Sequence, residues 1–454
     1  MRRLPFKSKP VYKNPLKAPL IIPWALSTTA MSRSSLIFNA LLLSCSVQLS
    51  SYLYSRWTKK QRTAQELNGG LPDPDSLHDF NLETATTRNH LYENKPVRIP
   101  YFQTMAHQPM HINNWIEIDK DLKWYIDQKA QVIKEQGKHV IDSLPENDAG
   151  CGELMEILVD YLPKRYPTLF EHIDCKGGGI WNKVTGERLT GLEGRIGVDA
   201  LMVCSRLVED DFLMGRERED GHVYFTGGLV AFPGFYLLSK KINKSLRIVH
   251  APVPYFNEKI LLSVERTLKR FAPNEPFERT SWEIVDDRDL FLQSGCGSGF
   301  AGAVDNIAKI GEADGRLSES QHPKDLYFRV DHQTFRKLPR TKAIIFGVHP
   351  IMKRLEDFAD SPLVPALLAK AHEEGDNKLM DYKLAPLYQD RMLPYLRELH
   401  AQQIEKGLIR GDEDVSHFRE LIRVEEGQSF PSTQTSLVNP TESEMAVRAE
   451  QAHF

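Results

Sequence analysis

The sequence has 454 residues, of which 41% are hydrophobic and 26% are charged, and its formal net charge is -3. These values are typical of a globular protein with one large or two ordinary domains, and they exclude both wholesale disorder and a general basic field for nucleic acid. The five cysteines are widely spaced and form no C-x-x-C pair, which excludes a disulfide framework or a cysteine zinc site and favours a reducing compartment.

Residues 1–66 form a basic N-terminal region with no acidic residue before its last position. Within it, residues 35–54 are uncharged, and their number is close to the about 20 residues that span a bilayer. The segment is followed by positively charged residues of the kind that flank a membrane span, namely Arg56, Lys59 and Lys60. This pattern predicts a transmembrane segment.

Two alternatives to a membrane anchor remain open at residues 35–54, namely a cleaved mitochondrial-type presequence and a soluble tail. An anchor implies the endoplasmic reticulum or a mitochondrial membrane. Positive charge on both sides of the segment leaves its orientation open. Translation from Met31 would leave a short basic cap before the anchor.

The globular part is predicted to extend from residue 96 to residue 407. Residues 67–95 form a linker that is rich in Gly, Pro and Asp near its start. Residues 424–454 are polar and poor in large apolar side chains, which predicts a disordered tail.

Two helices are expected early in the globular part. Residues 118–136 have amphipathic spacing, with Asp119 as a cap and Gly137 as a stop. Residues 152–162 form the second helix, which Pro163 should end.

The middle of the chain has the pattern of strands. Apolar and aromatic runs at 208–215 and 222–232 are joined by a charged turn, which predicts an antiparallel pair. Further strands are expected near 282–285 and at 343–348. Helices return at 362–373 and 384–405. Helices that flank a central antiparallel region indicate an α+β fold rather than alternating βαβ units.

The segment around His250 combines an imidazole with two prolines. Pro252 and Pro254 fix their own φ angles and keep the residue before each out of the helical region. A helix should follow from Ile260, because apolar residues recur there at helical spacing. Neutral imidazole is a good axial ligand for a metal or a haem. A buried histidine bonded to the backbone is the alternative, and spacing does not decide between the two.

Glu209, Asp210 and Asp211 lie inside an apolar run. In a strand, successive residues alternate faces, so at least one carboxylate would point inward and need a cationic partner. The group is therefore a candidate for binding an amine substrate. A solvated acidic cluster at a strand end is the alternative.

Residues 327–339 alternate in polarity as an extended segment does. Arg329, Gln333 and Arg336 concentrate hydrogen-bond donors there, together with His332. Arginine binds carboxylates, including haem propionates, through paired N–H groups. A solvated charged face would show the same pattern.

Residues 297–302 satisfy the G-x-G-x-x-G pattern, which in a dinucleotide site lies between a strand and a helix. No alternating β/α context surrounds it, so a glycine-rich loop is the preferred interpretation. The sequence contains neither G-x-S-x-G nor H-E-x-x-H, and hydrolase and zincin functions lack support.

Several of these stretches together resemble one family. The motifs are His250-Ala-Pro-Val-Pro254, Arg279-x-x-Trp282, Arg329-Val-Asp-His-Gln333 with Leu338-Pro339, and Ala343–Phe346. In this order they resemble the fungal HRQ proteins, which are similar to the haem-binding α-subunit of bacterial haem-dependent oxidative N-demethylase. The resemblance covers about residues 96–407.

The resemblance implies a PAS-like antiparallel sheet flanked by helices. It also implies a haem, expected to be haem b, and the oxidation of a small amine by oxygen with electrons from an external flavin or iron–sulfur protein. His250 becomes the expected iron ligand, with His107 and His332 as alternatives. The other implied cofactor residues are Trp282, Arg329, Gln333 and Arg336, and Asp210 or Asp211 would receive the protonated amine.

Three departures from the family pattern lie in these motifs. The family's arginine-valine-glutamate-arginine-glutamine run has Asp331 and His332 at its third and fourth positions here. Asp210 replaces a usual glutamate, and His349 stands where the family tends to carry an arginine. These changes put amine specificity and turnover in doubt, and a non-catalytic PAS-like protein that binds haem or a small ligand is the alternative function.

Overall fold

The computed structural model describes residues 67–102, 104–234, 236–291 and 321–421. The chain divides into two units at residue 62, and all described residues belong to the second unit. The predicted membrane segment 35–54, the glycine-rich stretch 297–302 and the predicted tail 424–454 lie outside the described residues. Within the described ranges, no helix has the length and apolar character needed to cross a bilayer.

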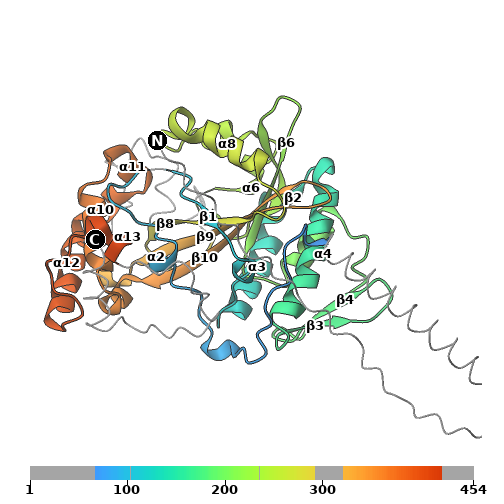
Figure 1. Cartoon of the computed structure of the whole chain (residues 1–454), viewed down its shortest axis with the longest axis horizontal. Helices are drawn as coiled ribbons and strands as arrows, with labels where there is room; N and C mark the ends of the chain where they lie inside the picture. Colours follow the sequence, from blue (N-terminus) through green and yellow to red (C-terminus); the bar gives the residue numbers. More distant parts are fainter. Residues whose placement is uncertain (1–66, 103, 235, 292–320, 422–454) are drawn as a thin grey trace, which may run out of the picture. The chain divides into compact units, whose positions relative to one another are not determined.

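A seven-stranded antiparallel sheet is the centre of the described body (Figure 1). Its strands run in the order β1-β8-β9-β10-β6-β7-β2. They are β1 (Gln108–Pro109), β2 (Ile141–Ser143), β6 (Asp211–Glu217), β7 (Val223–Leu229), β8 (Phe277–Val285), β9 (Tyr327–Lys337) and β10 (Ile344–Arg354). The sheet carries helices on its faces, so the predicted α+β class is confirmed, as is the antiparallel pairing of β6 with β7.

Side chains alternate between the two faces of the long central strands. On β9, Phe335 packs with the apolar residues of one layer, whereas Phe328 packs with those of another. The register pairs Arg279 with Gln333 and Thr280 with His332, so odd-numbered residues of β8 and β9 share one face and even-numbered residues share the other. Polar side chains of β8 and β9 can therefore contact one another only when their residue numbers are both odd or both even.

One face of the sheet is covered by short helices and α8. These are α6 (Leu238–Lys241), α7 (Leu246–Val249), a π-helical turn (Phe256–Ile260) and α8 (Leu261–Arg270). Val264 and Leu268 are buried against Phe277 and Phe335, because apolar residues three to four apart share one side of a helix. The helix expected after Ile260 is confirmed.

Three helices cover part of the other face. They are α3 (Leu122–Gln136), α4 (Asp148–Arg165) and α5 (Gly197–Cys204). The expected stop of α3 at Gly137 is confirmed, and the φ of 51° at this residue suits glycine. The expectation that Pro163 ends the next helix is wrong, because α4 continues to Arg165. Leu162 and Arg165 are buried there, so packing of the last turn outweighs the hydrogen bond that proline cannot donate.

The C-terminal helices pack around Trp282 and Phe328, on the sheet face away from α8. They are α10 (Val364–Glu373), α11 (Asn377–Tyr382), α12 (Gln389–Glu405) and α13 (Phe418–Leu421). Helices were expected at 362–373 and 384–405. The first expectation corresponds to α10, whereas the helix in the second range, α12, begins only at Gln389, after a 3-10 turn at Ala385–Leu387. A small second sheet contains β3 (Phe170–Ile173), β4 (Gly179–Asn182) and β5 (Arg188–Thr190), and the short helix α2 spans His90–Glu93.

Candidate functional site

A cavity of about 250 Å³ lies between the sheet and the layer of α6 to α8. Apolar side chains from the strands and from α8 form much of its wall, among them Leu213, Phe225, Phe346 and Leu268. An apolar cavity with a few polar groups is the usual form of a cofactor site. We call the sheet face that borders it the cavity face.

His250 lies in the wall of this cavity, directly after α7. Its Nδ1 is 3.0 Å from the carbonyl oxygen of Leu246, so Nδ1–H donates and Nε2 keeps its lone pair. The residue is half-buried, and the Nδ1 contact is the one hydrogen bond of the ring among the described residues. Burial, with a contribution from Lys241, lowers the pKa of His250 to about 4, and the ring is therefore neutral at physiological pH.

The predicted non-helical segment after His250 consists of two turns. The amide of Val253 donates to the carbonyl of His250 at 2.9 Å, and that of Phe256 donates to Val253 at 3.2 Å. Tyr255 adopts a left-handed conformation within the second turn. These turns bring the Phe256 ring onto the His250 imidazole, with ring centres 4.2 Å apart and planes 11° apart.

The cavity also contains a positive charge without an anion. Arg279 on β8 lines the wall, and its Nε is buried with no hydrogen-bond partner. Burial lowers its pKa to about 10. Lys241 lies nearby, and burial and the neighbouring Lys244 lower its pKa to about 8. A ligand with carboxylate groups would supply the missing partner.

An acidic group stands farther along β8. Glu283 is four residues from Arg279 and on the same face, about 13 Å away at the usual rise of a strand. Burial raises its pKa, against the opposing charge of Arg329. Asp331 also lines the cavity, and its Oδ1 accepts from Arg329 Nε at 2.8 Å. This acidic end can receive a cationic group.

Residues 106–393 match the family model described as haem-dependent oxidative N-demethylase, alpha subunit-like. The chain belongs to this family. Membership in this N-demethylase-like family assigns an oxidoreductase-like function related to oxidative N-demethylase, with dependence on haem. It also implies a partner subunit or an electron donor.

The residues of the cavity fit the haem that this N-demethylase-like family requires. His250 offers an unprotonated Nε2 whose ring is fixed by a backbone hydrogen bond and a stacked aromatic. Arg279 offers a half-buried guanidinium, whose Nε has no hydrogen-bond partner among the described residues, for a propionate. The apolar side chains of the wall would contact the porphyrin.

The structure brings only some of the predicted cofactor residues to the cavity. His250 and Gln333 line it. Arg329 lies on the same face of β9, but its guanidinium donates to Asp331 and to the carbonyl of Phe232. Arg336 lies on the opposite face, stacked 4.0 Å from the centre of the Trp115 ring.

Trp282 also lies on the face away from the cavity, where it stacks on Phe328 in the core under the C-terminal helices. Of the two alternative histidines, His107 packs against Phe277 with ring centres 4.8 Å apart. His332 is buried on the face opposite the cavity. Neither histidine lines the cavity.

The predicted amine-binding acids lie outside the cavity lining. Asp210 and Asp211 are each 1% exposed and lie against α3. Lys129 Nζ donates to the carbonyl oxygen of Asp210 at 2.6 Å and pairs with the Asp211 carboxylate at 3.4 Å. Asp211 also accepts the amide of Phe232 at 2.6 Å. For Asp211 the expected cationic partner is thus Lys129, whereas the buried Oδ2 of Asp210 has no hydrogen-bond partner among the described residues.

Sequence reasoning did not select Arg279 or Glu283 as site residues. The sequence does contain a pattern that indicates them: Arg279, Ser281 and Glu283 alternate with Thr280, Trp282 and Ile284, as residues on the two faces of a strand do. A strand longer than the expected 282–285 would have placed the three polar residues on one face.

Proposed function

We propose that this protein is a haem-binding oxidoreductase that oxidises a small amine with oxygen. The observation that carries the proposal is the unprotonated, unpartnered Nε2 of His250 in the wall of an apolar cavity. We further propose a PAS-like haem domain of the fungal HRQ type, on the motifs that surround His250 and Gln333.

In this proposal His250 holds the iron, and Arg279 and Lys241 bind the propionates of haem b. The haem supplies the oxygen chemistry when it is bound. The chain fixes the ligand ring, excludes water with apolar side chains, and orients the substrate. Glu283 receives the protonated amine at the acidic end.

Electrons would come from a separate flavin or iron–sulfur protein, in line with the partner that the family implies. We also propose that residues 35–54 tether the chain to the endoplasmic reticulum or a mitochondrial membrane. Alkaline carbonate extraction of cell membranes checks the tether. The full chain should stay in the pellet, and a chain lacking residues 35–54 should be released.

The iron ligand is tested by absorption spectra of the full chain reconstituted with haem. The wild type should show a Soret band of a histidine-ligated haem, and His250→Gly should lose this ligation and regain it with added imidazole. A colourless wild type, or a spectrum unchanged in His250→Gly, would contradict the proposal.

His372→Gln is a matched control for this experiment. The Nδ1 of His372 is 2.7 Å from the carbonyl oxygen of Leu368, one helical turn back, as in His250. Burial lowers the pKa of both histidines to about 4. His372 Nε2, however, is 3.2 Å from the Tyr388 hydroxyl and lies outside the cavity lining, so its replacement should leave the haem spectrum unchanged.

A haem or small-ligand binding protein without turnover is the second candidate. The ion pair of Asp331 with Arg329 favours it, because this pair offsets one negative charge at the proposed amine end. Oxygen uptake with a chemical reductant and a panel of secondary amines separates the two functions. Stable haem binding without amine-dependent uptake would select the binding protein.

A further inference from the structure

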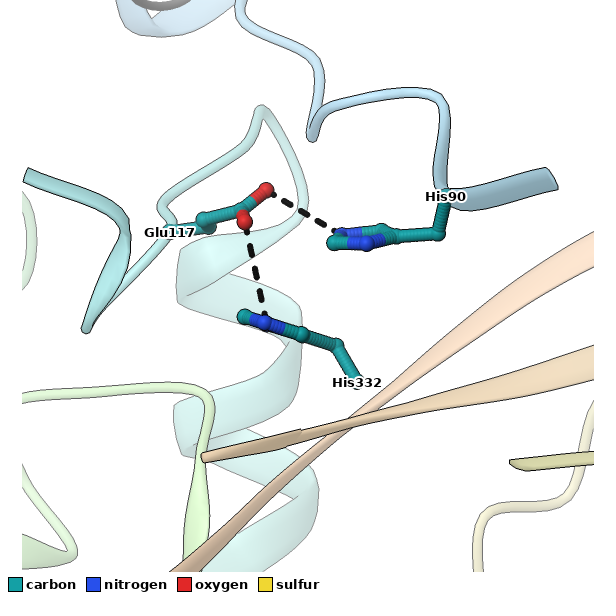
Figure 2. Close-up of side chains that lie close together, drawn as sticks. All are labelled: His90, Glu117 and His332. Atoms are coloured by element: carbon teal, nitrogen blue, oxygen red, sulfur yellow. Dashed lines mark ion pairs between the residues drawn. The ribbon is translucent and has the colours of Figure 1, made fainter. Parts of the chain in front are cut away.

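His90, Glu117 and His332 form a buried cluster on the face of the sheet opposite the cavity (Figure 2). They come from α2, from the loop before α3 and from β9. Their exposed fractions are 3%, 5% and 1%. One nitrogen or oxygen atom from each lies within 4.8 Å of the others.

Two ring nitrogens in this cluster have no hydrogen-bond partner. They are His90 Nε2 and His332 Nδ1, and both are buried. Each faces the Glu117 carboxylate, at 3.3 Å from Oε2 and 3.7 Å from Oε1 respectively (Figure 2). A buried polar atom without a partner costs about 1–3 kcal/mol. Their convergence on one carboxylate is the geometry that a coordinated cation satisfies.

Outer groups hold both rings in place. His332 Nε2 is 2.8 Å from Glu278 Oε2, so Nε2–H donates to the carboxylate and Nδ1 keeps the lone pair. His90 Nδ1 is 2.7 Å from the side-chain amide of Asn94. A cation on His90 requires this amide to present its oxygen to Nδ1–H. A ligating histidine typically has such an outer hydrogen bond. The rotation of the amide also breaks the hydrogen bond that Gln108 Nε2 donates to Asn94 Oδ1.

The charge around the cluster is negative. Arg88 donates to Glu117 and to Glu278, each at 2.7 Å, and also contacts Glu93 at 3.3 Å. One guanidinium therefore faces three carboxylates. Arg88 orients Glu117 toward the histidines without neutralising the group, and a divalent cation would bring the charge closer to balance.

We propose that His90, Glu117 and His332 bind a divalent transition-metal ion, with Zn²⁺ as the best match. Two imidazoles and one carboxylate are a donor set for Zn²⁺ or Fe²⁺. The site is distinct from the haem cavity, because the side chains of His332 and Gln333 point to opposite faces of β9. Its role is structural: the ion fastens the segment that carries α2 to the centre of the sheet.

The experiment uses the full, haem-loaded chain after treatment with a chelator, and Zn²⁺ is titrated by calorimetry. The wild type should bind one equivalent, with a rise in Tm and no change in the Soret band. His90→Gln and His332→Gln should each weaken binding at least about tenfold and abolish the rise in Tm.

His372→Gln is the control, because this histidine is equally buried but lies outside the cluster, and it should bind Zn²⁺ as the wild type does. Circular dichroism checks that each variant is folded. If the ligand variants do not fold, Glu278→Gln tests the same site through the outer hydrogen bond, with an expected loss of about tenfold or more. Failure of the wild type to bind Zn²⁺, or undiminished binding in the folded cluster variants, would overturn the proposal. The cluster would then be a network of ion pairs that binds no metal.

Discussion

Strand β9 borders two buried regions that differ in how many of their charged side chains form ion pairs. On the cavity face, neither Arg279 Nε nor His250 Nε2 has a hydrogen-bond partner among the described residues. On the opposite face, which we call the network face, Lys129 and Arg88 are each surrounded by oxygen atoms of the chain. Buried nitrogens of His90, His332 and Arg336 on this face have no hydrogen-bond partner among the described residues. A buried charge without a partner is costly, so it persists where a ligand supplies the partner.

Substitutions on the two faces should therefore affect different properties. Groups of the cavity face should govern ligand affinity, because their partner is the ligand. Groups of the network face should govern folding, because removal of one member leaves another buried charge without compensation. The four predictions below test this division.

Lys129→Met should have the largest effect, on stability. Lys129 is fully buried, donates to the carbonyl oxygens of residues 208 to 210 and pairs with Asp211. Its loss leaves the Asp211 carboxylate uncompensated, so the free energy of unfolding should fall by about 3–5 kcal/mol. Denaturant unfolding measures the change.

Lys123→Met is the matched control on the same helix, since Lys123 is exposed and pairs only with Asp127. Its replacement should cost less than about 1 kcal/mol. Equal losses in the two variants would show that burial of Lys129 has no special role.

His372→Gln should change how stability depends on pH. Burial, against the hydrogen bond to Leu368, lowers the pKa of His372 from 6.5 to about 4. The unfolded chain therefore takes up a proton first, and the free energy of unfolding falls as pH falls through this window, by up to about 1.4 kcal/mol per pH unit. The variant should lose this contribution, measured by denaturant unfolding from pH 7 to about pH 4. An unchanged slope would refute the lowered pKa.

Arg279→Met should lower haem affinity by about 10–100-fold, because a charge-assisted hydrogen bond is worth about 1.5–3 kcal/mol. Arg336→Met, on the network face, should change haem affinity less than threefold or so, since Arg336 lies over Trp115 and outside the cavity. Haem transfer to apomyoglobin measures both. The opposite ranking would restore Arg336 as the propionate partner.

Glu283→Gln should raise the KM for a secondary amine about tenfold, which is the smallest of these effects because Arg329 already offsets part of the negative charge at this end. Asp211→Asn, at the acid first expected to bind the amine, should leave KM unchanged in folded protein, because Asp211 is paired with Lys129. Amine-dependent oxygen uptake decides between the two acids.

Much of the fold could be predicted from local sequence. Alternating polarity predicted the extended segment that forms β9, and the charged turn between 215 and 222 predicted the pairing of β6 with β7. His250 could be selected because an imidazole beside two prolines is a pattern of adjacent residues. These features depend on neighbours in the chain.

The rest of the candidate site could not be predicted in this way. Arg279 and Arg336 are both arginines on central strands, and only the register of β8 against β9 places them on different faces. The cluster of His90, Glu117 and His332 joins three segments far apart in the sequence. No local pattern shows that they meet, because the sheet and its covering helices bring them together.

The stack of Phe256 on His250 has a consequence for how long the cofactor stays bound. The imidazole is confined by this ring on one side and by the Leu246 carbonyl at Nδ1, so it has few rotamers to lose on coordination. Binding to such a preorganised ligand forfeits little side-chain entropy. Replacement of Phe256 by a smaller apolar residue should therefore shorten the residence time of the iron porphyrin even though no bond to the metal is altered.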